Sequence, residues 1–268
     1  MILDKIKDRI GNFDGTIGIS YIDLGTGECC NAGNSDVFPA SGLVKLLILI
    51  EAFKRMEEGI INRSDKYVLT KEDYPQTEEK SYGALEFLHV GTELTLEDLY
   101  KLNVTVSDNM AFNILLKLFT KEAVNSTMET YGCHKTRIHR ALLDDEETAK
   151  GIKNYVSVQE MANLFYRMEK GQIVSGRASR EMLDILLHHQ KTSILPYYFS
   201  ESMEIAHQSG YDEREIMDMG IVYAEYPFIL CMASSTDNIR YAESIMRDIT
   251  LMCYQNSMGV NRKRKEVT

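Results

Sequence analysis

Strand-like segments at both ends of the chain, separated by a helical middle, constrain the fold most. Near the N-terminus, Thr16 to Asp23 ("TIGISYID") alternates and is β-branched, and "LGTGE" then turns the chain into a second short run. After Pro196, three more strands are predicted, at Glu204 to Ser209, Met217 to Tyr223 and Phe228 to Met232. Strands at both ends of a chain can share hydrogen bonds only when the ends meet. The pattern therefore predicts one sheet assembled from the two termini, with an all-helical insertion.

The middle of the chain shows helical periodicity. Leu46 to Glu58 is one apolar segment ended by Gly59, and "TELTLEDLYKLNVTVSDNMAFNILLKLF" supplies two more helices. Ser157 to Lys170 combines a serine cap with a following glycine. The same periodicity predicts helices at Ile2 to Ile10, Ser179 to His189 and Asp237 to Tyr254.

Composition limits the classes of function. The 268 residues carry a formal net charge of −10, which argues against nucleic-acid binding because phosphate neutralisation needs a basic surface. The charged N-terminus does not read as a signal peptide, and no stretch approaches the roughly 20 apolar residues of a membrane span. Five cysteines without metal-ligand spacing favour reduced thiols. We therefore expect a cytoplasmic protein without metal, cofactor or membrane contact, and the sequence does not indicate its oligomeric state.

One short stretch, "VFPASGLVKLLIL", places a lysine in an apolar helix start. Buried there, Lys45 must find hydrogen-bond partners or lose its charge. Ser41 lies four residues earlier and can share a helical face with that amine, which permits a nucleophile. A serine at a helix start is more often an N-cap, and we favour that interpretation for Ser41.

Three motifs occur in a fixed order. They are "FPASGLVK" from Phe38, the triplet Ser107-Asp108-Asn109, and "HQSG" ending at Gly210. In order and separation they resemble the S-x-x-K, S-D-N and K-T-G elements of the class A serine β-lactamases and penicillin-binding proteins. Stretches such as "SREMLDILLHHQ" and "MGIVYAEYPFILCMAS" extend this resemblance over nearly the whole chain.

The resemblance implies an α/β (α+β) β-lactamase-like fold. This fold has a mainly antiparallel sheet flanked by helices, plus an all-helical subdomain. We expect residues 1–37 and 197–268 to form the sheet subdomain and residues 38–196 the helical subdomain. The ligand pocket is expected between them.

The resemblance also implies roles for individual residues. A lysine activates a serine one turn earlier, the S-D-N serine passes a proton to the leaving nitrogen, and the K-T-G lysine and hydroxyl hold a substrate carboxylate. A loop glutamate activates the deacylating water. This chain departs from the pattern at the nucleophile position, Gly42, and at the K-T-G lysine position, Gln208. The loop glutamate aligns with Glu146, but Lys150 stands where an asparagine is expected.

The candidate site divides into two groups. Lys45, Ser107, Glu146 and, as an alternative nucleophile, Ser41 are the candidate catalytic residues. The candidate ligand-binding residues are Gly42, Asn109, Gln208, Ser209 and Gly210. The adjacent His188 and His189 are interpreted as a surface pair without a metal role, because neighbouring residues on a helix do not converge.

Two hypotheses for function follow. The first is a non-catalytic protein that binds a small-molecule or peptide-like ligand in the inherited cleft. It is favoured because removing the nucleophile of a serine hydrolase lowers the rate by about 10⁶-fold. The second is a weak hydrolase of β-lactams or peptide-like amides, of the β-lactamase type (EC 3.5.2.6), that uses Ser41 or water activated by Glu146.

Overall fold

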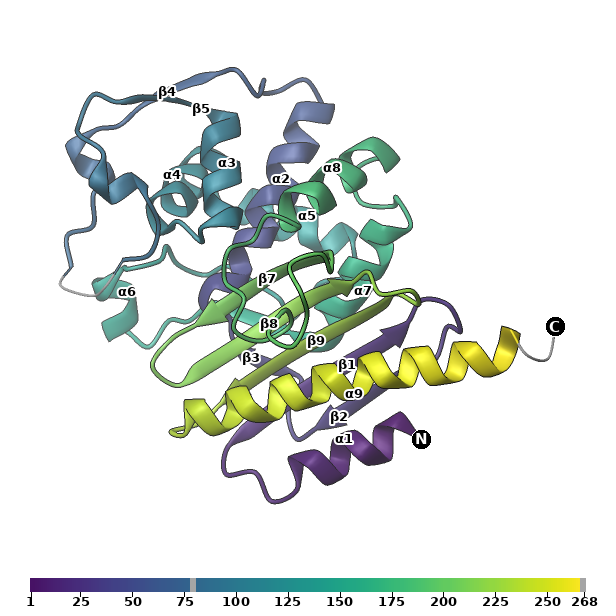
Figure 1. Cartoon of the computed structure of the whole chain (residues 1–268). Helices are drawn as coiled ribbons and strands as arrows, with labels where there is room; N and C mark the ends of the chain where they lie inside the picture. The colour runs from purple at the N-terminus through teal and green to yellow at the C-terminus, as the bar shows by residue number, and fades with distance from the viewer. Residues whose placement is uncertain (78–80, 266–268) are drawn as a thin grey trace.

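The computed structural model describes residues 1–77 and 81–265, and a five-stranded sheet organises them (Figure 1). The strand order is β2-β1-β9-β8-β7, and each neighbouring pair is antiparallel. This confirms the predicted sheet, in which strands from both ends of the chain pair directly. The strands are β1 Thr16–Asp23, β2 Cys29–Gly33, β7 Ile205–Tyr211, β8 Glu215–Val222 and β9 Phe228–Ser235.

Both faces of the sheet are covered by helices. On one face α1 (Ile2–Ile10) and α9 (Ile239–Lys265) lie side by side, and the strand residues facing them include Ile17, Leu230 and Met232. On the other face α7 (Val158–Glu169) packs against β1, β8 and β9. Successive strand residues point to opposite faces, so both faces of a covered sheet must be apolar.

The helical part of the molecule is built around α2 (Lys45–Glu57). Residues 46–53 of α2 are all buried, which is typical of a helix that is surrounded on every side. The helices around it are α3 (Leu96–Thr105), α4 (Asn109–Phe119), α5 (Lys121–Thr130) and α8 (Gly176–Leu186). Shorter elements complete the chain: β3 Val37–Pro39 pairs with β6 Tyr155–Ser157, β4 Lys66–Val68 pairs with β5 Glu93–Thr95, and α6 spans Asp145–Ala149.

Two helices have bounds that differ by three residues or more from the sequence-based prediction. The helix predicted from Ser179 begins at Gly176, because Ser175 caps it by accepting a hydrogen bond from Ala178 N at 3.1 Å. It ends at Leu186, three residues before the predicted end. The last helix extends to Lys265 instead of ending at Tyr254. Within the described ranges, none of the helices combines the length and the apolar character that a membrane crossing requires.

A short 3₁₀ helix, η1 (Ser41–Val44), leads into α2 and lies against the edge strand β7. Two glycines permit this close approach. A β-carbon on Gly210 would lie 3.0 Å from the backbone nitrogen of Gly42, and one on Gly42 would lie 3.0 Å from the carbonyl oxygen of Ser209. The start of the buried helix is thereby held against the open edge of the sheet.

Candidate active-site cleft

A small cleft of about 100 Å³ lies where η1, β7 and the turn before α4 meet. A loop that precedes α6 contributes one wall, and the turn after β7 contributes another. Its size is below that of most drug-sized ligand sites, which enclose about 300–1,000 Å³. The cleft is lined by Ser41, Gly42, Lys45, Tyr82, Ser107, Asn109, Arg140, Leu142, Leu143, Lys191, Tyr211 and Asp212.

Lys45 lies at the centre of this site. Its side chain is almost fully buried, and Nζ donates to Ser107 Oγ at 3.0 Å and to Asn109 Oδ1 at 2.7 Å. The pKa of the amine is lowered to about 7, mainly by burial and then by the positive charge of Lys191, while Asp108 opposes the shift. Lys45 has therefore found partners and also lost part of its affinity for a proton, so it can act as a base near neutral pH.

The turn before α4 holds two of these partners in place. Ser107 has a positive φ of 56°, which places it outside the helix. Asp108 caps α4, because its side chain accepts a hydrogen bond from Ala111 N at 2.9 Å. Its neighbours Ser107 and Asn109 do not serve as the cap. The other oxygen of Asp108 accepts from the backbone nitrogens of Ala84 and Leu85 at 2.6 and 2.9 Å. Because Asp108 caps the helix, the side chains of Ser107 and Asn109 are available to Lys45.

Gly42 occupies the position where a nucleophilic hydroxyl was expected. A β-carbon built on Gly42 would lie 3.4 Å from Ser107 Oγ and 3.0 Å from the Ser209 carbonyl oxygen. Unlike Ser41, which has a φ of 41°, Gly42 does not have a positive φ. Its backbone conformation therefore does not require a glycine.

The prediction that Ser41 is an N-cap is wrong. Ser41 is the first residue of η1, Ala40 precedes it in the cap position, and η1 has no side-chain cap hydrogen bond. The positive φ of Ser41 is unusual for a residue with a side chain. Ser41 lines the cleft instead.

Glu146 does not lie in the cleft, which corrects the expected pocket position. Its carboxylate is 83% exposed and pairs with Lys150 at 2.8 Å. Asp144 caps the short helix α6, which carries Glu146 outward. Leu142 and Leu143 form the wall that this loop presents to the cleft. The hypothesis of water activated by Glu146 therefore has no support in the geometry.

The edge strand places Ser209 and Gly210 beside η1, but neither they nor Gln208 are among the residues that line the cleft, and Ser209 and Gly210 border a neighbouring cavity instead. Gln208 is fully buried, its amide donates to the Ser209 carbonyl oxygen at 3.3 Å, and its Oε1 has no hydrogen-bond partner among the described residues. His189 was expected on the surface but is buried, and its Nε2 lies 2.8 Å from Ser209 Oγ. Only His188 of the histidine pair is exposed.

Two cations in the cleft were not predicted. Lys191 Nζ lies 4.3 Å from the centre of the Tyr82 ring, and both residues line the cleft. Arg140 donates hydrogen bonds to the carbonyl oxygens of Ile152 and Ala141, each at 2.9 Å. These bonds hold the guanidinium in place, and because carbonyl oxygens are uncharged they do not neutralise its positive charge. Neither residue belongs to a motif, and no spacing in the sequence marks them as site residues.

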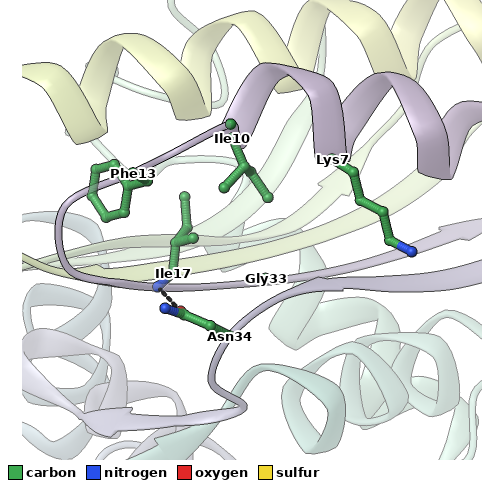
Figure 2. Close-up of a pocket in the computed structure, with 7 residues that line it drawn as sticks. Lys7, Ile10, Phe13, Ile17, Gly33 and Asn34 are labelled. Atoms are coloured by element: carbon green, nitrogen blue, oxygen red, sulfur yellow. Dashed lines mark hydrogen bonds between the residues drawn. The ribbon is translucent and has the colours of Figure 1, made fainter.

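A larger cavity of about 310 Å³ lies between α1 and β1 and shares none of its lining residues with the cleft (Figure 2). Ile10, Phe13 and Ile17 line it together with Lys7. Its one amide side chain, Asn34, is occupied by the backbone, since it accepts from Ile17 N at 2.8 Å and donates to Gly15 O at 3.0 Å. This cavity does not offer the chemistry that the cleft does.

Comparisons with known proteins agree on one family. The curated β-lactamase CARB-4 of Pseudomonas aeruginosa is 26% identical over 197 residues, which cover 72% of this chain and 67% of that protein. PBP-A is 23% identical, with 95% of both chains covered and a TM-score of 0.84. A β-lactamase from Sphaerobacter thermophilus has the same identity of 23% and TM-score of 0.84, with 96% of both chains covered. A leucine-to-glutamate variant of PBP-A has been solved as an acyl-enzyme complex with penicillin G.

The two solved structures establish the fold, which matches the β-lactamase-like architecture that the motifs implied. The family model described as the β-lactamase enzyme family matches residues 2–257, which is most of the chain. Together with the motif order and the arrangement of Lys45, Ser107 and Asn109, this match shows that the chain belongs to the β-lactamase enzyme family.

Proposed function

We propose that this protein binds a small-molecule or peptide-like ligand in the cleft and does not form an acyl-enzyme with it. The observation that carries the proposal is Gly42. The groups that would surround a nucleophile are present, since Ser107 Oγ lies 3.4 Å from the β-carbon position and 3.0 Å from Lys45 Nζ. The hydroxyl itself is missing, so there is no oxygen at this position to attack a carbonyl carbon.

The wall of the cleft supports the same proposal. Hydrolysis of an acyl-enzyme needs a base that holds water near the acyl group. Leu142 and Leu143, from the loop before α6, line the cleft. The carboxylate of Glu146, a few residues later, is exposed to solvent. Apolar side chains in this position favour retention of a ligand over hydrolysis.

Charge indicates the class of ligand. Lys191 and Arg140 line the cleft beside Lys45, whereas Asp212 is the one acidic residue among the described lining residues. Cations that line a concave site attract anions and raise their local concentration. We therefore expect a ligand with at least one anionic group, and an amide-containing acid fits both this charge and the inherited cleft.

A second candidate function is a weak hydrolase that uses Ser41. Its supporting observation is that Ser41 lines the cleft next to Lys45, with a positive φ and without a capping role. Unusual backbone conformations occur often at functional sites. Against it, Lys45 Nζ donates to Ser107 and Asn109, and Ser41 is not among its hydrogen-bond partners.

One experiment separates the two candidates. The intact protein is incubated with benzylpenicillin, and its mass is measured over time while binding is followed by calorimetry. The proposal expects saturable binding with an unchanged protein mass. A mass increase by one benzylpenicillin, abolished by Ser41→Ala, would instead establish the weak hydrolase. Ser126→Ala is the matched control for the serine substitution, because Ser126 is exposed on α5 and lines neither this cleft nor the cavity beside it.

A further inference from the structure

His189 and Ser209 form a buried pair at the edge of the sheet. His189 Nε2 lies 2.8 Å from Ser209 Oγ, and His189 Nδ1 lies 2.8 Å from the carbonyl oxygen of Val104. The two side chains are contributed by the segment after α8 and by β7, so the contact joins the helical part to the sheet. Ser209 also borders a second cavity, of about 420 Å³, which shares Tyr82, Lys191 and Tyr211 with the cleft.

The partners of His189 fix the direction of its hydrogen bonds. A carbonyl oxygen can only accept, so the Nδ1 that faces Val104 must carry a proton. The pKa of His189 is lowered to about 3, chiefly by burial and by nearby His207, Lys191 and Lys45, so the ring is neutral at pH 7. A neutral ring with its proton on Nδ1 has a lone pair on Nε2. Ser209 must then donate its hydroxyl proton to His189.

This geometry also matches that of a serine nucleophile with its base, but the surroundings oppose that role. A general base must become positively charged as it takes the serine proton. His189 Nδ1 bonds to the carbonyl oxygen of Val104, where a catalytic histidine would bond to a carboxylate. The nearby positive charges of Lys45 and Lys191 disfavour a charged imidazole ring. The ring of His207 is also packed against it, with centroids 4.7 Å apart. His189 is therefore built to stay neutral, which suits an acceptor and not a catalytic base.

We propose that His189 holds the Ser209 hydroxyl as a hydrogen-bond acceptor toward the cavity, so that this edge binds an uncharged donor group of the ligand instead of a carboxylate. The motif that Ser209 belongs to implied the opposite polarity, a hydroxyl that holds a carboxylate. The inference rests on the proposed function, because it names the ligand group that meets Ser209. The observation behind the inference is the hydrogen bonding of His189, which is independent of the Gly42 observation behind the proposed function.

The charges around the cavity narrow the class of donor. Lys191 borders the cavity together with Arg247, so an ammonium group would meet like charge there. An amide N–H or a hydroxyl avoids that repulsion and still donates to the Ser209 oxygen. The anionic group of the ligand would then bind to Arg140 and Lys191 in the cleft, which adjoins the cavity at Tyr82, Lys191 and Tyr211. The ligand class is an acid that also carries a neutral amide or hydroxyl donor.

The protonation of His189 is tested first, by ¹⁵N NMR on full-length protein with labelled histidine. The His189→Leu spectrum identifies the signals of His189 among the six histidines. At pH 7 the expected result is a neutral ring with its proton on Nδ1 and an unprotonated Nε2. A proton on Nε2, in a neutral or a charged ring, would overturn the proposal, because Ser209 would then keep its own proton free for the ligand.

The ligand preference is tested with two matched probes, benzylpenicillin and the derivative in which a carboxamide replaces its carboxylate. His189→Leu cannot accept the Ser209 proton, so the serine becomes able to donate to a carboxylate. We expect the preference for carboxylate over carboxamide to rise about tenfold in His189→Leu, the size of one hydrogen bond gained or lost. In a Ser209→Ala background the same substitution should leave the ratio unchanged. His188→Leu, a change at the exposed neighbour, is the matched control.

The outcomes distinguish this inference from the proposed function. If both probes bind but His189→Leu leaves their ratio unchanged, the inference is wrong and the binding function stands. If neither probe binds and the Nδ1 proton is observed, the binding function fails while the polarity of Ser209 is supported. Stoichiometric labelling of Ser209 by a fluorophosphonate, lost in Ser209→Ala, would overturn the inference by showing that the serine is a nucleophile. Should His189→Leu fail to fold, substitution of the other five histidines one at a time assigns the His189 signals by elimination, and the spectrum of the unaltered protein then decides the polarity.

Discussion

Gly42 and Ser107 face each other across the cleft at the separation that a serine in place of Gly42 would use. The β-carbon position of Gly42 lies 3.4 Å from Ser107 Oγ, and that oxygen accepts a hydrogen bond from Lys45 Nζ at 3.0 Å. The lysine and the second serine are therefore arranged around a position that carries no side chain. This relationship makes the chemistry of the cleft testable by substitution, one group at a time.

The first prediction concerns Lys45 and pH. Its pKa is about 7 in the folded protein, below its usual value of about 10.4 in an unfolded chain. Between these values the unfolded chain binds more protons, so the free energy of unfolding should rise with pH. The gain is up to about 1.4 kcal/mol per pH unit for one group. Lys45→Met removes this term, so the stability of the natural protein relative to the variant should increase from pH 7 to pH 10.

Denaturant unfolding at pH 7, 8 and 9 measures that difference, and groups that titrate in both proteins cancel. Parallel stability curves for the two proteins would show that Lys45 keeps its ordinary pKa. Lys54→Met is a suitable control, since Lys54 is on the same helix and partly exposed, with an ion pair to Glu58 at 3.6 Å.

A second prediction concerns the cap of α4. Asp108 accepts hydrogen bonds from the backbone nitrogens of Ala84, Leu85 and Ala111 and is almost fully buried. Asp108→Ala would leave three backbone donors without that partner, and the two buried ones, on Leu85 and Ala111, cost about 1–3 kcal/mol each. We expect a loss of at least about 2 kcal/mol in the free energy of unfolding, measured by denaturant titration. Asp108→Asn, which keeps an acceptor, should lose less, and equal losses in both variants would contradict this account.

The third prediction replaces the idea that Ser41 caps a helix. Since η1 has no side-chain cap, Ser41→Ala should change the free energy of unfolding by less than about 0.5 kcal/mol. Ser41→Gly should stabilise the protein by about 1 kcal/mol, because glycine adopts a positive φ without the steric cost of a β-carbon. Thermal and denaturant unfolding measure both effects. A loss near 1 kcal/mol in Ser41→Ala would restore the capping role.

The sequence predicted those parts of the site that short-range interactions fix. Ser107 and Asn109 flank a residue that caps the next helix, so their positions follow from the local chain once the motif is identified. Lys45 could be placed because a lysine in an apolar helix start must have buried partners. The sheet was predictable for a similar reason, since alternation marks strands wherever they lie in the chain.

Long-range packing decided the position of His189, while local contacts that the motif alignment did not consider decided that of Glu146. His189 follows a helix that ends at Leu186, so it leaves the helical surface and reaches Val104 and Ser209. Glu146 matched a spacing, but the cap at Asp144 turns it outward, where Lys150 binds it. The position of His189 cannot be read from its neighbours in the sequence, whereas the outward direction of Glu146 follows from residues within four positions of it.

The fourth prediction restores the nucleophile. The backbone of Gly42 has no positive φ, so Gly42→Ser is compatible with the fold after a shift of a few tenths of an ångström at the Ser209 carbonyl. The new hydroxyl would stand beside Ser107 and within a turn of Lys45, which can accept its proton. Gln208→Lys restores the lysine of the K-T-G element, which the family resemblance assigns to a substrate carboxylate. Mass spectrometry should detect a benzylpenicillin adduct on the double variant and none on the natural protein. A folded double variant that stays unmodified would show that the cleft has been rebuilt for another purpose.

The last prediction concerns the lifetime of that adduct. In the Gly42→Ser, Gln208→Lys variant the acyl group should persist, because Leu142 and Leu143 line the cleft where a base would have to hold water. Leu142 is the better of the two for a substitution. Its backbone nitrogen and oxygen both bond to Asn113, at 2.9 and 2.8 Å, while Leu143 has a positive φ of 57°. Adding Leu142→Glu should shorten the lifetime of the adduct by about 10²-fold, the lower end of general base catalysis. Leu142→Gln, which has the same size but is not a base, should leave the lifetime unchanged, and equal lifetimes in the two variants would place the attacking water elsewhere.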